Sequence, residues 1–241
     1  MIKLGNNSIG KIYLGSNAIG KAYLGSNLVY QSGSPTPPGP VIEPVFYDRL
    51  VLDGTAYIET NYVLPANCSI GGNFGYETQK IAQRVFRSQG GGGYILLTYG
   101  GSTSSTRRQL VLFYDSASAL VNNLYVNFTF DSYSFFMTPT KYGIGETAST
   151  YTKGNSHPTG GIVFGDGIGG QAFTGRMGIF KVYDSTAAGA TSAIDLENNY
   201  TPVATFRPCT YNGEAGMWYV EGNQFFGNTA GAGNLTVANN E

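Results

Sequence analysis

The chain has 241 residues, of which 41% are hydrophobic, enough for one domain of ordinary size and a smaller accessory segment. Only 12% are charged, about half of the usual ~25%, and the net charge is −1 with no basic cluster beyond Arg107-Arg108, which argues against nucleic acid as a partner. No window offers the ~18 apolar residues of a membrane helix, and no apolar signal segment follows Met1, so we expect neither membrane insertion nor secretion.

Residues 1–30 repeat a ten-residue unit three times, each with Leu-Gly followed by Asn-Asn or Ser-Asn. Apolar and other residues alternate within a unit and Gly-Ser-Asn suits a tight turn, so we predict a small β-meander. A sheet of this size buries too little surface to be stable alone. We therefore predict an anchor or oligomerisation segment, covered by copies of itself, by another protein or by the main domain. The predicted interface residues are Ile12, Tyr13, Leu14, Tyr23, Leu24, Val29 and Tyr30.

Residues 31–44 form the predicted linker. The segment is rich in Pro, Gly and Ser and has few residues that could form a core. Its prolines favour an extended chain of about 3 Å per residue, which suits a spacer between two folded parts.

Residues 45–241 are predicted to be one β-domain, because short alternating runs are separated by Gly and Asn turns. Many short strands of this kind indicate a sandwich or barrel. A short helical turn is expected only within Thr186–Leu196. The predicted strands are Val45–Asp53, Ala56–Thr60, Ser69–Tyr76, Ala82–Ser88, Tyr94–Tyr99, Gln109–Asp115, Leu120–Phe130, Ser134–Thr138, Gly161–Phe164, Phe173–Asp184 and Met217–Val220.

Residues suited to catalysis are few and scattered. The only histidine, His157, precedes Pro158 in a predicted loop, and a Ser–His pair or a histidine metal site would depend on this single ring. Asp195 and Glu197 would share one face of a strand, as glycoside hydrolysis could use, or else lie in a loop. The third acid that β-sandwich glucanases place on such a strand is missing. We therefore predict that the chain is not an enzyme and has no catalytic residues and no cofactor.

Two further features are interpreted as structural. Gly165–Gly170 matches a G-x-G-x-x-G pattern, but a strand-like run follows it where a dinucleotide site needs a helix, so we predict a hairpin turn. Cys68 and Cys209 either form one disulfide or stay free and buried, and we favour free thiols. No metal ligands are predicted, since no motif spacing supports a calcium site built from Asp131, Asp166 or carbonyl oxygens.

Three segments of the main domain resemble the laminin-G-like, concanavalin A-like jelly rolls of bacteriophage structural proteins. Leu52–Tyr62 is similar to the opening strand pair of that family, Val163–Asp184 to a later strand, and Arg207–Asn228 to its closing segment. The segments occur in the family's order. The resemblance implies an all-β fold with an antiparallel β-sandwich of the jelly-roll type.

The repeats of residues 1–30 resemble the leaders of structural proteins from phages of gut Bacteroidetes, including crAss-like phages. This implies a virion protein, a head or tail fibre or a capsid decoration, made in the host cytoplasm and anchored by its repeats. Its expected partners are other virion proteins, further copies of itself as a dimer or trimer, and a host-surface carbohydrate. Tyr94, Tyr99 and Trp218 are the candidate sugar contacts, although each ring could equally belong to the core. The alternatives are a lectin module without a structural role and, less favoured, a glycan-degrading enzyme.

Overall fold

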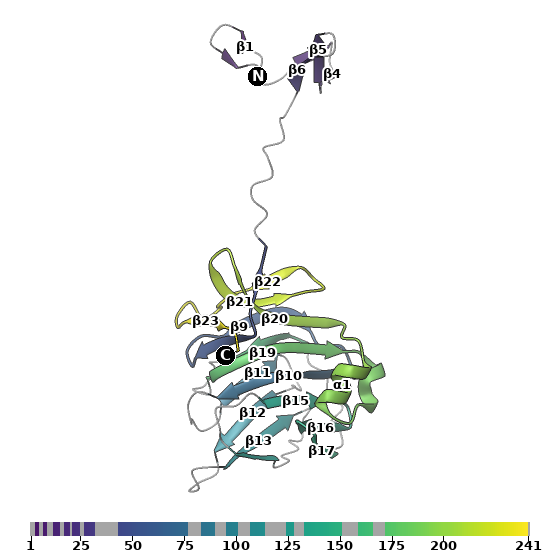
Figure 1. Ribbon diagram of the computed structural model, residues 1–241, viewed down its shortest axis with the longest axis vertical. Helices are drawn as coiled ribbons and strands as arrows, with labels where there is room; N and C mark the ends of the chain where they lie inside the picture. Colours follow the sequence, from purple (N-terminus) through teal and green to yellow (C-terminus); the bar gives the residue numbers. More distant parts are fainter. Residues whose placement is uncertain are drawn as a thin grey trace. The chain divides into compact units, whose positions relative to one another are not determined.

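The computed structural model describes the main domain over residues 43–76, 83–89, 133–150, 159–165 and 172–240 (Figure 1). Side chains are described there except at residues 76 and 147. For the remaining strands the backbone alone is described, at residues 3–4, 7–8, 12–14, 17–19, 21–24, 27–31, 95–100, 107–113 and 124–127. The chain divides into two compact units, Met1–Glu43 and Pro44–Glu241.

The described N-terminal strands form three separate two-stranded antiparallel sheets rather than the single meander expected from the repeats. Each repeat contains a pair of strands: β1 (Lys3–Leu4) with β2 (Asn7–Ser8), β3 (Ile12–Leu14) with β4 (Asn17–Ile19), and β5 (Lys21–Leu24) with β6 (Asn27–Gln31). The paired strands of each sheet are therefore only two residues apart in the sequence.

The main domain is an antiparallel β-sandwich, which confirms the predicted fold class. Its larger sheet has the strand order β17-β16-β15-β10-β19-β20-β21-β22, with β8 beside β19, β23 beside β8 and β7 beside β20. The bounds are β7 (Val45–Phe46), β8 (Arg49–Asp53), β10 (Ser69–Tyr76), β15 (Tyr133–Met137), β16 (Lys141–Ile144), β17 (Thr147–Thr150), β19 (Thr174–Tyr183), β20 (Ala204–Tyr211), β21 (Glu214–Tyr219), β22 (Gln224–Phe226) and β23 (Leu235–Ala238).

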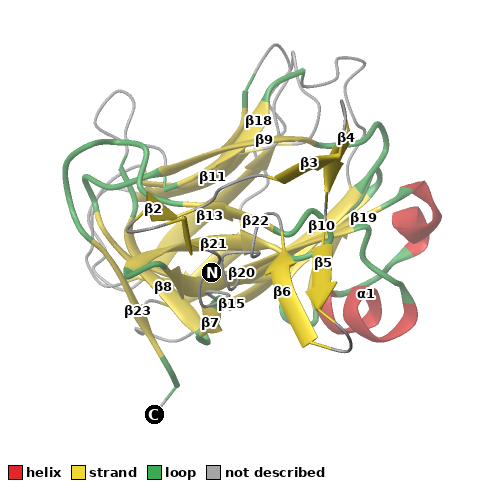
Figure 2. Ribbon diagram, turned by 90° about the horizontal axis from the view of Figure 1, so that it is seen from above, coloured by secondary structure: helices red, strands yellow, loops and turns green. Residues whose placement is uncertain are grey.

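The smaller sheet has the order β14-β13-β12-β11-β18-β9. Its strands are β9 (Ile58–Val63), β11 (Gln83–Ser88), β12 (Ile95–Gly100), β13 (Arg107–Phe113), β14 (Leu124–Asn127) and β18 (Gly161–Phe164). β13 begins at the Arg107-Arg108 pair, two residues before the predicted strand Gln109–Asp115. In Figure 2 the strands of the two sheets overlie one another, with the helices outside them.

The core between the sheets is rich in aromatic side chains. Phe86 of β11 lies edge-on to Phe180 of β19 with ring centroids 5.0 Å apart, and Phe164 of β18 meets Phe180 at 5.2 Å and Phe206 of β20 at 5.6 Å. Each of these rings is at most 1% exposed. Because edge-to-face contacts add to the burial of such large rings, these pairs hold the two sheets together.

The helical part lies on the outer face of the larger sheet, against β10 and β15. A 3₁₀ helix, η2 (Ser185–Gly189), precedes α1 (Ala193–Asn199), so the helical turn expected within Thr186–Leu196 is present and ends at Asn199. Leu196 of α1 is buried in a second, smaller cluster with Phe136, Tyr183 and Ala187. This cluster fixes α1 on the sheet and leaves its other side open to solvent.

Hydrogen bonds join the segment after β8 to the segment that precedes the last strand, β23. The Asp53 carboxylate accepts hydrogen bonds from the N–H of Asn234 at 2.6 Å and from the N–H and hydroxyl of Thr55 at 2.8 and 2.7 Å. Thr229 donates its N–H to the Tyr57 carbonyl at 2.8 Å. The segments Leu52–Tyr62 and Arg207–Asn228, which carry the family resemblance, also meet in space, since the rings of Tyr62 and Tyr219 lie 5.2 Å apart.

Candidate functional site

The outer face of the larger sheet is hollowed around Asn73, where β19 contains a β-bulge. The pairing changes from Gly72 with Phe180 to Phe74 with Met177, so Gly178 and Ile179 together oppose the single residue Asn73. Phe74 is buried in the core, and Asn73 lines two adjoining hollows on the outer face. Bulges commonly re-aim a side chain beside a functional site.

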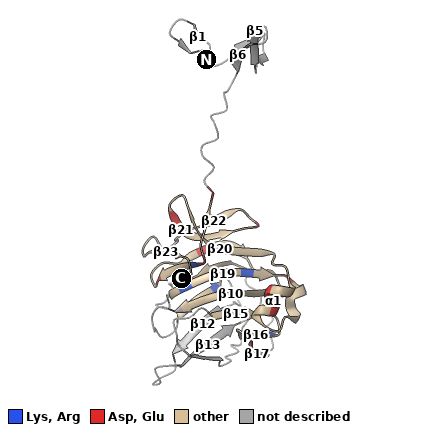
Figure 3. Cartoon of the chain, viewed as in Figure 1, with Lys and Arg blue, Asp and Glu red and all other residues tan. Residues whose placement is uncertain are grey.

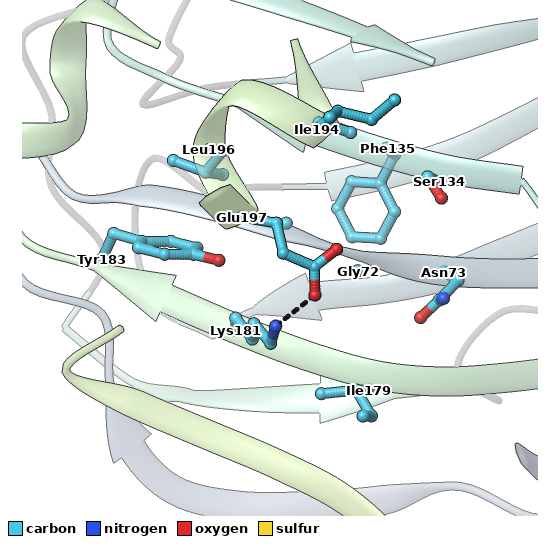
Figure 4. Close-up of a pocket in the computed structure, with 12 residues that line it drawn as sticks. Gly72, Asn73, Ser134, Phe135, Ile179, Lys181, Tyr183, Ile194, Leu196 and Glu197 are labelled. Atoms are coloured by element: carbon cyan, nitrogen blue, oxygen red, sulfur yellow. Dashed lines mark hydrogen bonds and ion pairs between the residues drawn. The ribbon is translucent and has the colours of Figure 1, made fainter. Parts of the chain in front are cut away.

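The first hollow lies between α1 and the sheet, with a volume of about 490 Å³ including the part open to solvent. Lys181 of β19 donates from Nζ to Oε1 of Glu197 on α1 at 2.5 Å, and Figure 4 shows this ion pair facing the hollow. Ser134 of β15 lies opposite Asn73 in the strand register. The lining residues are Gly71, Gly72, Asn73, Ser134, Phe135, Ile179, Lys181, Tyr183, Ala193, Ile194, Leu196 and Glu197.

Two consecutive glycines of β10 let the helix and the neighbouring strand approach this closely. A Cβ atom on Gly71 would lie 3.0 Å from Leu196 Cδ2, and one on Gly72 would lie 2.7 Å from the Ile179 carbonyl oxygen. The distance of 2.7 Å from residue 72 is shorter than a Cβ atom tolerates, and a backbone carbonyl cannot move aside as the end of a side chain can. At Gly71 and Gly72, β10 therefore contributes main chain to the lining of the hollow.

Asp195 orders the first turn of α1. Its carboxylate accepts the Asn199 side-chain amide at 2.7 Å and the N–H and hydroxyl of Thr191 at 2.7 and 2.9 Å, and these bonds lower its pKa. Ser192 caps the helix by accepting the Asp195 N–H at 3.0 Å. The predicted placement of Asp195 and Glu197 on one strand face, or in a loop, was wrong. Both lie on a helix, where residues two apart do not face each other.

The second hollow adjoins the first at Asn73 and has a volume of about 370 Å³, including the part open to solvent. Its charged residues are Asp48, Arg49 and Arg176. The Asp48 carboxylate accepts the Asn240 N–H at 2.7 Å, and Arg49 Nη2 donates to the Asn239 carbonyl at 2.8 Å. The full lining is Asp48, Arg49, Asn73, Phe74, Gly75, Arg176, Gly178 and Asn240. The two hollows together are called the trough below.

The trough is notable in a molecule with few charges. Figure 3 shows long stretches of the described strands without any charged residue. The trough nevertheless contains two ion-forming groups in its first hollow and three in its second. Tyr183, which lines the first hollow, has its pKa raised to about 12 by burial and by the nearby Glu197, so its hydroxyl stays protonated and can donate a hydrogen bond.

Of the three rings predicted to contact sugar, only Trp218 has a described side chain. It lies on β21 and is 8% exposed, with its ring 5.2 Å from that of Tyr211, and Tyr211 in turn packs 5.5 Å from Phe225. Tyr99 lies in β12, for which the backbone alone is described, and Tyr94 is outside the described residues. Contact of these rings with a ligand stays a prediction.

The predicted interface residues of the repeats lie in strands β3, β5 and β6. Ile12 pairs with Ile19, Tyr13 with Ala18 and Leu14 with Asn17. In the third hairpin Tyr23 pairs with Leu28, Leu24 with Asn27 and Tyr30 with Ala22, and Val29 lies at a register shift. Their side chains are outside the described part of the chain, so their role as an interface stays a prediction.

Cys68 and Cys209 are both free and both buried, as we favoured from the sequence. Burial raises the pKa of the Cys209 thiol to about 11. Within the described residues no group of three or more His, Cys, Asp or Glu side chains could hold a metal ion, and no helix is long and apolar enough to cross a membrane. His157, Asp131 and Asp166 lie outside the described residues.

The residues of the trough were not predicted from the sequence. Asn73, Ser134 and Lys181 belong to strands whose existence was predicted, but no spacing links them, because three different strands bring them together. One signal was available. The predicted strand Ser69–Tyr76 contains the run Gly-Gly-Asn-Phe-Gly, and glycines inside a strand often mark a bulge or a close approach of another backbone.

No family model and no curated protein matches this sequence. Among solved structures, the chain is similar to the native heptameric SAP-like pentraxin from Limulus polyphemus. The sequence identity is 13%, and the match covers 73% of this chain and 96% of that chain with a TM-score of 0.46.

Proposed function

We propose that this chain is a bacteriophage display protein whose main domain binds a host-surface carbohydrate in the first hollow of the trough, without catalysis. The observation that carries the binding proposal is the convergence of Asn73, Ser134 and the Lys181–Glu197 pair on one open, glycine-floored face. These groups supply donors and acceptors side by side, as a polyhydroxylated ligand requires.

An apolar wall completes the hollow. Ile194 of α1 is 52% exposed and lies at its rim with Ile179. A sugar ring presents hydroxyl groups along its edge and C–H groups on its face, so the polar groups and the isoleucines suit the two parts of one ligand.

The carboxylates of this region support binding rather than hydrolysis. Asp195 is engaged by Thr191 and Asn199, and Glu197 is paired with Lys181. Glycoside hydrolysis needs one protonated acid and one free carboxylate on opposite sides of the scissile bond. Among the described residues that line the first hollow, Glu197 is the one carboxylate, and Lys181 pairs with it.

A glycan array followed by calorimetry tests the binding proposal. We expect Asn73→Ala to weaken the binding of a captured glycan by about tenfold, because it removes hydrogen bonds worth about 1–2 kcal/mol. Asn198→Ala is the matched control, since Asn198 is an exposed amide of α1 that does not line the trough. Equal affinities for both variants, or no glycan bound by the wild type, would refute the proposal.

The display role is supported by the resemblance of the repeats and by the division of the chain at Glu43. We expect the full chain to form dimers or trimers and to bind phage particles, and the protein lacking residues 1–44 to be a monomer that still binds glycan. Light scattering and co-sedimentation with particles measure this. A full chain that is monomeric and does not sediment with particles would contradict the anchor.

A further inference from the structure

We propose that the first hollow recognises the acetamido group of an N-acetylated sugar, with its N–H bonded to Glu197 and its carbonyl to Asn73 and Ser134. This inference rests on the proposed carbohydrate binding and names the class of sugar. Among the described residues that line the hollow, Lys181 and Glu197 are the charged ones, and they pair with each other. An anionic group of the ligand would face Glu197 and a cationic group would face Lys181. A neutral group that has both a donor and an acceptor therefore suits the hollow better.

Glu197 can accept a hydrogen bond from such a group. Lys181 Nζ donates to its Oε1 at 2.5 Å, and no hydrogen bond among the described residues uses its Oε2. The Glu197 side chain is 64% exposed, so a ligand can reach this oxygen. Hydrogen bonds to an ionised carboxylate are roughly twice as strong as those between neutral groups. The N–H of an acetamido group is a donor that fits this acceptor.

Donors for the carbonyl lie on the other side of Glu197. Asn73 of β10 and Ser134 of β15 are paired across the two strands. Figure 4 shows them together on one side of Glu197, with Lys181 on the other. No hydrogen bond among the described residues uses either of these two side chains. Because the N–H and C=O of a trans amide point in opposite directions, an acceptor and a donor on two sides of the hollow can bind one amide.

The bulge in β19 sets the direction of the Asn73 amide. A Cβ atom on Gly178 would lie 2.6 Å from Asn73 Oδ1, so the amide oxygen packs against the bulge and a larger residue there would displace it. The amide nitrogen, which is a donor, forms the other end of the group. The φ angle of Gly178 lies outside the left-handed region, so an alanine at residue 178 would move Asn73 without straining the backbone.

An apolar surface for the acetyl methyl group lies beside these polar groups. Ile179 of β19 and Ile194 of α1 both line the hollow. Of the six large apolar side chains that are exposed in the described part of the chain, Ile194 is the one that lines it. A hydroxyl group at the same position of a sugar has no methyl group to bury and only one polar heavy atom. The hollow thus distinguishes the two substituents by the methyl group and by the second polar atom.

The test uses two matched pairs of sugars, N-acetylglucosamine with glucose and N-acetylgalactosamine with galactose. Each is coupled to a multivalent carrier, which makes weak binding measurable, and its affinity for the full chain is measured by surface plasmon resonance. We expect at least one N-acetylated sugar to bind at least tenfold more tightly than its partner, because two hydrogen-bonding groups and a methyl group replace one hydroxyl. Glucosamine and galactosamine, which keep the nitrogen but lack the acetyl group, should bind no more tightly than glucose and galactose.

Variants assign this preference to the hollow. Glu197→Gln should reduce it severalfold, because a neutral amide oxygen is a weaker acceptor than a carboxylate. Ile194→Ser should also reduce it severalfold by removing the contact with the methyl group. Gly178→Ala should reduce it about as much as Asn73→Ala does. In a protein that already carries Asn73→Ala, Gly178→Ala should have no further effect, since the atom that it displaces is gone.

Glu214→Gln and Val220→Ser are the matched controls, because both side chains are exposed and line neither hollow. Thermal unfolding of each variant separates a loss of binding from a loss of folding. Equal binding within both pairs, tight binding of the free amines, or a preference unchanged in Glu197→Gln and Ile194→Ser overturns the acetamido site. The proposed function then still stands for any glycan whose binding is weakened by Asn73→Ala. Absence of binding to every glycan overturns both.

Discussion

Lys181 on β19 and Glu197 on α1 are joined by an ion pair of 2.5 Å that connects the helix to the sheet across the first hollow. The Lys181 side chain is 23% exposed and that of Glu197 is 64% exposed, so solvent screens the pair. Pairs of this kind contribute about 0.2–1 kcal/mol to stability. The pair is thus better suited to shaping the hollow than to holding the fold.

Replacing either partner should consequently affect binding more than folding. We expect Lys181→Gln and Glu197→Gln to lower the free energy of unfolding by roughly 0.5 kcal/mol, measured by urea denaturation. The affinity for glycan should fall by about tenfold, since a charged hydrogen bond to a ligand is worth about 1.5–3 kcal/mol. A loss of stability of several kcal/mol without a change in affinity would assign the pair a purely structural role.

Replacing the glycines of β10 by alanine should lower the stability of the domain by different amounts. Gly72→Ala meets the Ile179 carbonyl oxygen and should destabilise the domain by about 2–3 kcal/mol. Gly71→Ala meets the end of the Leu196 side chain, which can shift, and should cost about 1 kcal/mol. Gly189→Ala is the control, because its nearest contact is the Tyr200 hydroxyl at 3.5 Å. Urea denaturation measures the free energy of unfolding of each variant. A Gly72→Ala variant as stable as Gly189→Ala would contradict the close contact between Gly72 and Ile179.

The Asp53 carboxylate should make stability depend on pH in the acid range. Partial burial raises its pKa, but hydrogen bonds from Thr55, Asn234 and Ala56 outweigh that effect and lower the pKa to about 2 from the ordinary 3.8. The stabilisation is complete above pH 3.8 and is lost as the pH falls toward about 2. Because the group is largely exposed, we expect a contribution of roughly 1 kcal/mol after screening. Asp53→Asn should make the free energy of unfolding, measured by urea denaturation, depend less on pH between these two values. If the pH dependence is the same as in the wild type, Asp53 is not its cause.

The buried thiols should be unreactive in the folded protein. Burial raises the pKa of the Cys209 thiol to about 11. Both cysteines are 0% exposed, so a reagent in solution reaches neither sulfur atom in the folded protein. We expect a disulfide reagent to label neither thiol in the native state and both in urea. The labelling rate should follow global unfolding, and a reductant should leave the melting temperature unchanged. Rapid labelling of one thiol without denaturant would indicate local opening around it.

The sequence predicts the strands best where alternation and glycine boundaries coincide. β10 and β18 have the predicted bounds, Ser69–Tyr76 and Gly161–Phe164. β20 is not predicted, since a proline argues against a central strand. Pro208 is accommodated because the strand beside β20 changes, from β19 up to Phe206 to β7 from Cys209. The missing N–H of Pro208 therefore falls where neither neighbour requires it.

The candidate site is harder to predict from the sequence than the fold. Asn73, Lys181 and Arg49 come from three strands, and their meeting depends on the bulge in β19 and on the order of strands in the sheet. Periodicity reports which face a residue occupies, and it carries no information about which strand lies next to which. Glu197 adds a further difficulty, because its hollow exists only when Asp195-Leu196-Glu197 is helical.

The position of β8 decides how the domain would bear a mechanical load. A pull on the segment before Pro44 meets β7 first, which is held to β20 by two residue pairs, and then β8. β8 is held by four pairs to β19 and by four to β23, so its ladders are loaded in shear along their length. β19 also carries Lys181 and Arg176 of the trough. In the proposed display role, tension between the particle and the bound surface would pass from β8 directly to β19.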